Sequence, residues 1–291
     1  MFQRTLYAIV LLLLPLLILA GDIDPAAAYL QDYLRTRADL SGGETVFHFT
    51  GEVYSLIPGQ KSMQLFAVDG YNISRLQKVE GGYQLLEKEV LLLLDHRTKE
   101  ILNTWRNPFT GETLPVLHIL NDPTNQSFVY EPDMLPYIPA MLPSERLDES
   151  IIYHSEIFPF YPQLLPRREY NANVQSDYFQ AAEITEYRVR TQALADRGAS
   201  SVPAEYNWSY ISPWLPFMNM SDRAGQLLFV ARGEKLKGGF AALPTALKGY
   251  IMTHHIDFSQ APTIWTEPNQ DPWSYFKELT EQEISDEEGL K

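Results

Sequence analysis

The sequence predicts an all-β-dominated protein, a single antiparallel β-barrel or strongly bent sheet with peripheral helices. Apolar residues recur with a period of two from Thr45 onward, and turn signals such as Gly81-Gly82 separate short strand patterns. The 291 residues, 45% of them hydrophobic, are enough for one large core. Because open edges on so long a meander invite aggregation, we expect the sheet to close or fold on itself.

The first residues have the pattern of an export signal. Residues 1–20 carry one Arg and then a short uncharged apolar block that ends at Ala20, which predicts a signal peptide and a periplasmic or extracellular location. The block is too short for a spanning helix, so we expect no stable membrane span after cleavage. Within residues 21–44 we predict a helix from Pro25 to about Ala38, with Asp24 as its N-cap.

Residues 45–268 form the predicted single β domain. Asp69-Gly70 and Gly81-Gly82 are read as hairpin turns. The predicted strands start at Thr45 and continue as Gln64 to Val68, Asn72 to Val79, Tyr83 to Leu94, Leu102 to Arg106, Leu114 to Leu120, Ser127 to Tyr130, Ile151 to Phe158, Tyr178 to Val189, Tyr206 to Ile211 and Gln226 to Arg232.

Three segments depart from the strand pattern. Residues 131–168 are too rich in proline for central strands, so we predict an extended loop with one strand inside, placed as a lid over the mouth of the barrel. Pro244 is expected to start a helix that runs to His254. Residues 269–291 are predicted to form an acidic helical tail.

Composition excludes several classes of function. A formal charge of −14 argues against nucleic acid as a partner, because phosphate binding needs a basic patch. The absence of cysteine excludes thiol nucleophiles and Cys-based metal sites. No nucleotide, dinucleotide or hydrolase motif occurs, so no cofactor is predicted. No local metal motif exists, although a site gathered from His48, His118 and His154 stays open.

Several motifs together resemble a known family. They are Gly51-Glu52-Val53-Tyr54, the block from Trp105 to Glu112, Asn121-Asp122-Pro123 and Pro213-Trp214-Leu215-Pro216-Phe217-Met218. In these the chain is similar to an uncharacterised bacterial and fungal family, the domain of unknown function DUF1838, over roughly residues 38–268. The resemblance implies a single β-rich domain that is often exported, and it implies no mechanism.

His118 is the first candidate for chemistry. It is the one polar residue in an apolar strand pattern, and its ring points opposite to Leu117 and Ile119. If that face is the interior, His118 is a candidate general base, oriented by Asp122 or Glu112. The alternative is a structural histidine bonded to a turn.

Two further charged residues are candidates. Arg106, beside Trp105, could clamp an anionic group or stack on an aromatic ligand, or it could pair with Glu112 across the turn. Glu183 shares a strand face with small residues and would either pair with an arginine or project into a cavity, where burial would raise its pKa.

Two functions are the leading hypotheses, ahead of an envelope interaction module that uses the acidic surface, and the sequence leaves the oligomeric state undetermined. The first is a cofactor-free acid/base enzyme for a small apolar or aromatic molecule, with His118, Asp122 and Glu183 as catalytic residues. The second is a non-catalytic binding protein, lipocalin-like in general architecture. The residues expected to contact the ligand in either case are Trp105, Arg106, Asn107, Glu112, Asn121 and Trp214.

Overall fold

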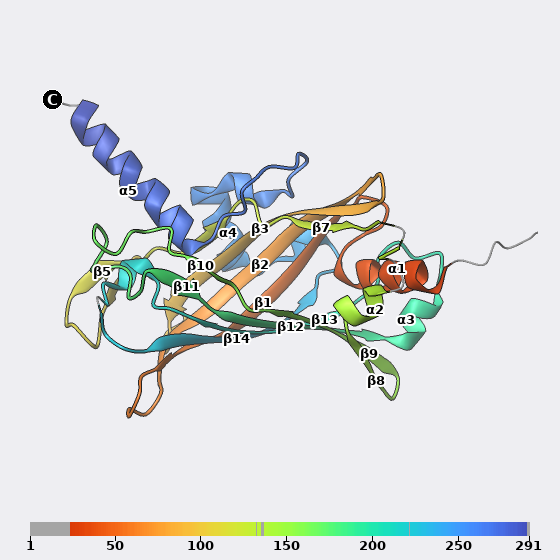
Figure 1. Cartoon of the computed structure of the whole chain (residues 1–291), viewed down its shortest axis with the longest axis horizontal. Helices are drawn as coiled ribbons and strands as arrows, with labels where there is room; N and C mark the ends of the chain where they lie inside the picture. Colours follow the sequence, from red (N-terminus) through yellow and green to blue (C-terminus); the bar gives the residue numbers. More distant parts are fainter. Residues whose placement is uncertain (1–23, 132, 135–136, 221, 290–291) are drawn as a thin grey trace, which may run out of the picture.

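The computed structural model describes residues 24–131, 133–134, 137–220 and 222–289 (Figure 1). Its main element is a ten-stranded antiparallel sheet in the order β6-β3-β2-β1-β14-β13-β12-β9-β8, with β7 also paired to β3. These strands are β1 (Glu44–Leu56), β2 (Met63–Val79), β3 (Gly82–Asp95), β6 (Ile119–Asn121), β7 (Gln126–Val129), β8 (Ser144–Leu147), β9 (Ser150–Ile157), β12 (Ala182–Arg190), β13 (Glu205–Ser212) and β14 (Gln226–Lys235).

Three predicted strand boundaries are corrected. The pattern from Tyr178 to Val189 divides into β11 (Tyr178–Gln180) and β12, which belong to different sheets. Asp69-Gly70 is no turn, because β2 runs through it and Gly70 pairs with Phe49 on one side and Leu91 on the other. The pattern from Leu114 to Leu120 divides into β5 (Thr113–Pro115) and β6, and β5 pairs with β4 (Thr104–Arg106) in a separate two-stranded sheet. The turn predicted at Gly81-Gly82 does join β2 to β3.

The large sheet is strongly bent. β3 and β12 are five strands apart, which in a flat sheet would separate them by about 24 Å. The guanidinium of Arg37 nevertheless lies 2.5 Å from Glu87 on β3 and 5.3 Å from the ring centre of Tyr187 on β12. The described strands still form an open path from β6 to β8, and no closed barrel is found among them.

Glycine allows the close packing at the bend. Phe49 on β1 lies in register between Gly70 of β2 and Gly233 of β14. A Cβ atom on Gly70 would meet the Phe49 ring at 2.8 Å, and one on Gly233 would meet the Phe49 Cα atom at 2.7 Å. Both contacts are far closer than van der Waals distance, so any side chain here would push the strands apart.

The two faces of the sheet carry separate apolar cores. On β3, Leu85, Leu91 and Leu93 belong to the large core on the inner face, whereas Val90 and Leu92 belong to a smaller core on the outer face. The helix α4 (Thr245–His254) covers the outer face through Leu247 and Ile251, which belong to the same smaller core. The helix predicted after Pro244 is therefore confirmed.

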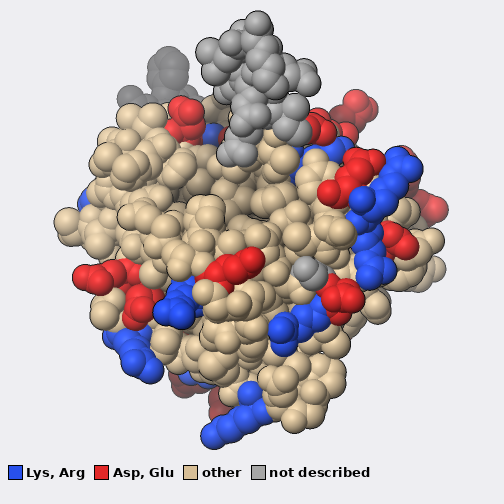
Figure 2. Space-filling model, turned by 90° about the vertical axis from the view of Figure 1, so that its left-hand side faces the viewer, with Lys and Arg blue, Asp and Glu red and all other residues tan. Residues whose placement is uncertain are grey.

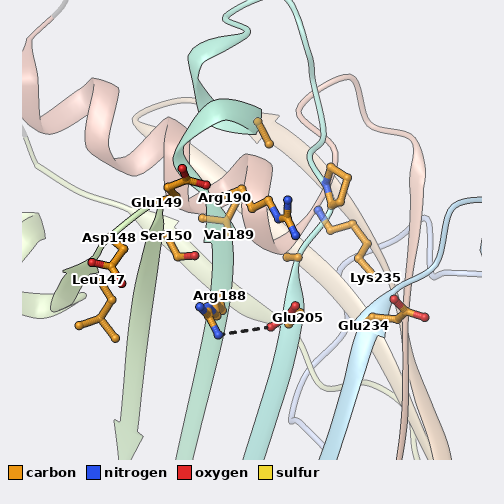
Figure 3. Close-up of a pocket in the computed structure, with 13 residues that line it drawn as sticks. Leu147, Asp148, Glu149, Ser150, Arg188, Val189, Arg190, Glu205, Glu234 and Lys235 are labelled. Carbon is orange, nitrogen blue, oxygen red and sulfur yellow. Dashed lines mark ion pairs between the residues drawn. The ribbon is translucent and has the colours of Figure 1, made fainter.

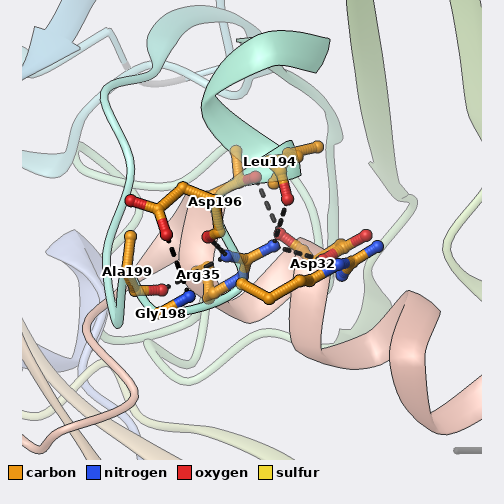
Figure 4. A network of polar contacts seen from close by, with 8 residues as sticks. Asp32, Arg35, Leu194, Asp196, Gly198 and Ala199 are labelled. Carbon is orange, nitrogen blue, oxygen red and sulfur yellow. Dashed lines mark hydrogen bonds and ion pairs between the residues drawn. The ribbon is translucent and has the colours of Figure 1, made fainter.

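The helix α1 (Pro25–Arg37) packs at one end of the inner face (Figure 1). Arg35 fixes it to the loop after the short helix α3 (Thr191–Ala195), as Figure 4 shows. The Arg35 guanidinium donates to the carbonyl oxygens of Leu194, at 2.9 Å, and Asp196, at 2.6 Å, and it pairs with Asp32 at 2.6 Å. This network holds α1 in place against the core.

The segment predicted as a proline-rich loop holds more structure than expected. Its described part contains α2 (Ile138–Met141) and three strands, β8, β9 and β10 (Phe160–Pro162), rather than one strand. β8 and β9 extend the large sheet, and β10 pairs with β11 (Tyr178–Gln180). Pro143 precedes β8, and Pro159 and Pro162 flank and end the short β10, so none of these three interrupts a central ladder.

The C-terminal helix α5 (Pro272–Gly289) projects from the end of the molecule opposite α1 (Figure 1). Its first turn packs inward, because Trp273 is 1% exposed and its ring lies edge-on to Phe179 at 4.7 Å. Short 3-10 turns, η2 (Pro216–Met218), η3 (Gly239–Ala242) and η4 (Ile256–Ser259), complete the described elements. None of the helices in this part of the chain is long and apolar enough to cross a membrane. The predicted signal peptide, residues 1–20, lies outside the described residues.

Candidate functional site

A cluster of ionisable side chains lies on the inner face of the sheet. Residues alternate between faces along β3, so Glu87 and Glu89 share the face of the core residues Leu85 and Leu91. Carboxyl groups are rarely placed in an apolar core unless they are paired or serve a function. Each carboxylate of the cluster is therefore expected to have a partner or a functional role.

Glu89 lies next to Asn121 of β6, and the two residues are direct register partners. Nδ2 of Asn121 donates to Oε2 of Glu89 at 2.8 Å. Burial raises the pKa of Glu89 to about 7, and the nearby carboxylate of Glu183 contributes to the increase. At neutral pH the Glu89 carboxyl group can therefore either donate or accept a proton.

Glu183 comes from β12, on the opposite limb of the bent sheet. Its Oε1 accepts a hydrogen bond of 2.8 Å from the indole N–H of Trp208 on the neighbouring strand β13. Burial raises the pKa of Glu183, and this effect outweighs the opposing hydrogen bond from Trp208. The bend thus brings two carboxyl groups with raised pKa values within electrostatic reach of each other.

Solvent still reaches this pair. Glu89 and Glu183 are only partly buried, whereas the neighbouring Leu91, Trp208 and Phe229 are almost completely buried. A side chain has accessible surface only where a water-sized probe fits against it. Water therefore reaches part of the surface of both residues.

Glu87, the third carboxylate of the cluster, is neutralised by an ion pair with Arg37. Nη2 of Arg37, from the end of α1, donates to both carboxylate oxygens of Glu87, at 2.5 and 2.6 Å. Both side chains are 2% exposed. The guanidinium also lies over the rings of Phe47 and Tyr187, at 5.6 and 5.3 Å. Removal of either charge would leave the other buried without a partner.

Two tyrosines border the carboxyl pair. Burial raises the pKa of Tyr206 and of Tyr210 well above the usual value, and the charges of Glu183 and Glu89 add to the effect. Their phenol groups therefore stay protonated and can donate hydrogen bonds at any physiological pH. The ring of Trp208 stacks on Tyr210 at 5.5 Å, which gives this limb an aromatic surface.

His118 lies on the other face of the sheet. Its Nδ1 accepts a hydrogen bond of 3.0 Å from the backbone N–H of Leu93, and its ring meets Tyr250 of α4 edge-on at 5.5 Å. Burial lowers the pKa of His118 to about 4, so the imidazole is neutral at pH 7. This geometry corresponds to the structural alternative, because the ring satisfies a backbone donor under α4.

Asp122 is also placed apart from Glu183. Its Oδ2 pairs with Nζ of Lys88 at 2.8 Å, and Lys88 alternates with Glu87 and Glu89 and so faces the outer side. Among the predicted site residues, the inner-face cluster includes Glu183 and Asn121.

The other predicted ligand contacts lie around the β4–β5 hairpin. Asn107 is fully buried and donates through Nδ2 to the carbonyl oxygen of Met218 at 2.8 Å, while its Oδ1 accepts from the N–H of Phe109. Trp105 packs against Phe66 and Phe217, at 5.0 and 6.4 Å between ring centres. These residues hold the hairpin against the end of the core.

The other residues expected to contact a ligand, Trp214, Arg106 and Glu112, lie outside the inner-face cluster. Trp214 is buried and donates to the carbonyl oxygen of Arg223 at 3.0 Å. Arg106 and Glu112 are exposed, and no ion pair joins them in the described part of the chain.

Sequence reasoning missed Glu87, Glu89 and Arg37. A signal for the first two was present, because Glu87 and Glu89 share one strand face with Leu85 and Leu91 in an otherwise apolar pattern. Arg37 gave no such signal, because a basic residue in the last turn of a helix is ordinary.

No group of three or more His, Cys, Asp or Glu side chains in the described residues could hold a metal ion. His48 instead pairs with Asp69 at 2.7 Å, and His154 lies 3.7 Å from Glu186.

A separate pocket of about 710 Å³ opens between the β8–β9 turn and the ends of β12, β13 and β14 (Figure 3). Its charged lining is mixed, with Arg188 4.0 Å from Glu205. Burial lowers the pKa of Lys235, on its wall, to about 7, but the ammonium donates to the carbonyl oxygens of Arg35 and Ala38. We favour the inner-face cluster because its titratable groups converge, whereas the charged residues that line this pocket, apart from Lys235, are exposed to solvent.

Comparison with known proteins gives a family and no activity. No curated protein matches the sequence. The sequence matches the family described as protein of unknown function, DUF1838, over residues 42–280, which includes Glu87, Glu89, Asn121 and Glu183 and begins after Arg37. The match covers most of the chain, and the protein therefore belongs to the DUF1838 family.

Proposed function

We propose that this protein is a cofactor-free acid/base enzyme that acts on a small molecule with an apolar or aromatic body. The supporting observation is the convergence of Glu89 and Glu183 from opposite limbs of the sheet, both partly accessible within an apolar core. One carboxylate would take a proton from the bound molecule, and the other carboxyl group would return a proton to a different atom. The reaction class is an isomerisation by proton transfer, which consumes no co-reactant.

The environments of Glu89 and Glu183 suit them to the roles of proton donor and base, respectively. With a pKa of about 7, Glu89 still carries its proton in part of the molecules at neutral pH and can act as the proton donor. Glu183 is held by the N–H of Trp208, a bond that favours its ionised form and suits it to act as the base. Tyr206 and Tyr210 would stabilise an oxygen that gains negative charge during the transfer.

The proposed substrate would be enclosed by the bent sheet as in a barrel, although the described strands at the two edges of the sheet are not hydrogen-bonded to each other. α1 would form one wall, and the aromatic residues at the start of α5 and on β11 would close the opposite end. At that end, uncharged residues cover most of the surface, and acidic and basic side chains are scattered over it (Figure 2). Such a surface suits the approach of an apolar molecule better than that of nucleic acid.

Export is part of the proposal. The apolar pattern of residues 1–20 and the absence of cysteine support a periplasmic or extracellular protein that depends on its core rather than on disulfides. N-terminal sequencing of protein purified from its own host is expected to begin at Gly21. A chain that still begins at Met1 would contradict cleavage.

The function is tested by activity profiling. Wild-type protein and the variants Glu89→Gln and Glu183→Gln are incubated with small-molecule extract of the host, and the products are followed by mass spectrometry. We expect a metabolite pair of equal mass to interconvert with wild type and to stay unchanged with either variant. Glu156→Gln, at an exposed position of β9, is the matched control and should behave as wild type.

A non-catalytic carrier is the second candidate. The opposite limb is rich in aromatic residues, and Tyr210 among them keeps partly accessible surface that a bound ring could contact without any chemistry. Native mass spectrometry of the protein from its host would then show a retained molecule, and profiling would show no conversion by wild type. Equal conversion by wild type and Glu89→Gln would contradict the enzyme proposal.

A further inference from the structure

An apolar strip lies on the solvent side of the β10–β11 pair. From Phe158 to Leu165, exposed residues alternate with half-buried or buried ones, so every second side chain of this extended segment projects into solvent. The exposed members are Phe158, Phe160, Pro162 and Leu164, and none of them is polar. In an ordinary half-buried strand the solvent positions are polar, so this pattern indicates a partner that the described residues do not supply.

The inward side chains hold the strip in place. Tyr161 stacks on Phe179 at 4.8 Å, and Phe179 meets the buried Trp273 of α5 at 4.7 Å. The Tyr161 hydroxyl donates to Oδ2 of Asp271 at 2.8 Å. The strip is therefore a surface fixed to the core, with its apolar side chains turned outward.

Tyr178 of β11 widens the strip. Its ring lies parallel to that of Phe160, with 5.2 Å between ring centres and 2° between the planes, and the two residues are 51% and 65% exposed. Phe158 is also 65% exposed, and Leu164 is 42% exposed. These four residues together expose about 400 Å² of apolar surface, a patch of the size that often has a function in a monomer.

The size of the strip disfavours a second copy of the chain as its partner. A stable protein–protein interface buries about 800 Å² on each partner, which is about twice the area of the strip. A bilayer needs no such area, because even a few apolar side chains that leave water for the headgroup region contribute to attachment.

The charges near the strip also favour a lipid surface. Residues 157–166 and 178–182 contain no charged side chain, although 21% of the whole chain is charged. Arg167 follows directly, is exposed and has no ion-pair partner among the described residues. Aromatic rings beside a long basic side chain are typical of proteins at a membrane surface, where the guanidinium reaches a phosphate. The net charge of −14 repels anionic lipids, so a zwitterionic headgroup is favoured.

We propose that the strip of Phe158, Phe160, Leu164 and Tyr178 attaches the protein to the surface of a bilayer with zwitterionic headgroups. The four side chains enter the headgroup region, and Arg167 pairs with a lipid phosphate. The protein then lies on the bilayer through this strip. Membrane attachment does not depend on the acid/base function, because none of these residues belongs to the inner-face cluster.

A reporter on the strip tests the proposal. The chain contains no cysteine, so one introduced cysteine can carry an environment-sensitive fluorophore. Gln180 is exposed and is the register partner of Phe160, so Gln180→Cys places the reporter on the strip. Gln192→Cys, on α3, places it at the opposite end of the molecule (Figure 1).

The full chain is mixed with phosphatidylcholine vesicles that carry a quencher in their acyl chains. We expect the emission of the reporter at position 180 to shift to the blue and to be quenched, and the reporter at position 192 to stay unchanged. No response at position 180 would overturn the proposal. A response at position 192 alone would show attachment through the N-terminal end and would also overturn it.

Serine substitutions identify the residues that attach. In the Gln180→Cys protein, Phe160→Ser combined with Tyr178→Ser should weaken vesicle binding about ten-fold or more, because two aromatic rings no longer leave water. Ile264→Ser is the matched control, because Ile264 is 72% exposed but lies outside the strip. An equal loss in the control would overturn the assignment. Thermal unfolding should be unchanged in all these variants, because the replaced side chains are exposed.

Sedimentation without vesicles tests for a second copy of the chain. We expect the mass of the wild-type particle to be the same as that of the variant with Phe160→Ser and Tyr178→Ser. A dimer that these substitutions dissociate would show that the strip is an interface between copies, and membrane attachment through it would be refuted.

Discussion

Replacement of Glu89 by glutamine should change how stability depends on pH. The folded protein holds the Glu89 proton more tightly than the unfolded chain, because the pKa rises from 4.5 to about 7. The folded state is therefore fully favoured below pH 4.5, and its advantage declines as the pH rises towards 7. Glutamine keeps the shape and the bond to Asn121 but has no proton to lose.

The magnitude follows from the two pKa values. Ionisation of Glu89 lowers the free energy of unfolding by about 0.8 kcal/mol at pH 5 and by about 3.4 kcal/mol at pH 8. Glu89→Gln should therefore gain about 2.5 kcal/mol relative to wild type between these two pH values. Glu183 acts in the same direction and is present in both proteins, so the difference between them comes mainly from Glu89.

Urea unfolding followed by tryptophan fluorescence at pH 5 and pH 8 provides the measurement. The exposed Glu156→Gln control should show the same pH dependence as wild type. A difference between wild type and Glu89→Gln that is the same within about 0.5 kcal/mol at both pH values would refute the reasoning. Glu89 would then be as well solvated in the folded protein as in the unfolded chain.

Three further substitutions test the framework of the site. Arg37→Leu leaves the Glu87 carboxylate buried alone and should cost about 3–5 kcal/mol in chemical denaturation; full stability in this variant would contradict the buried pair. His118→Ala removes the side-chain acceptor of the Leu93 N–H and should cost about 1–3 kcal/mol, with conversion in the activity profiling unchanged; a loss of conversion in the folded variant would place His118 in the site. Gly70→Ala should prevent folding or cost several kcal/mol, whereas Gly249→Ala in α4, with open space around it, should be neutral or stabilising by thermal unfolding.

Local patterns predicted much of the fold. Alternation of apolar residues found β1, β3, β9, β13 and β14 to within a few residues, because burial of one sheet face imposes that period. The prediction of a turn at Asp69-Gly70 was wrong for a physical reason. This pair has the composition of a turn, but Gly70 serves the close approach of Phe49 and not a change of chain direction.

The site was harder to predict than the strands. Glu183 and Asn121 were singled out from sequence, because each interrupts an apolar pattern. Their association with Glu89 depends on the bend, which brings β3 and β12 together across four intervening strands. Neither spacing nor composition encodes which strands meet across a bend. His118 was given a role for the same reason, since its face could not be assigned before α4 was placed over it.

The sheet joins two halves that are distant in sequence, and this connection links folding to activity. Glu89 belongs to the meander β1 to β3 and Glu183 to the meander β12 to β14. Among the described strands, the two units are hydrogen-bonded to each other where β1 pairs with β14, as in Leu56 with Gln226. Pairing over such a separation has a high entropic cost and is slow in folding. Each half can form its hairpins early, but neither holds a complete carboxyl pair. Recovery of ligand binding during refolding should therefore lag behind the recovery of strand structure.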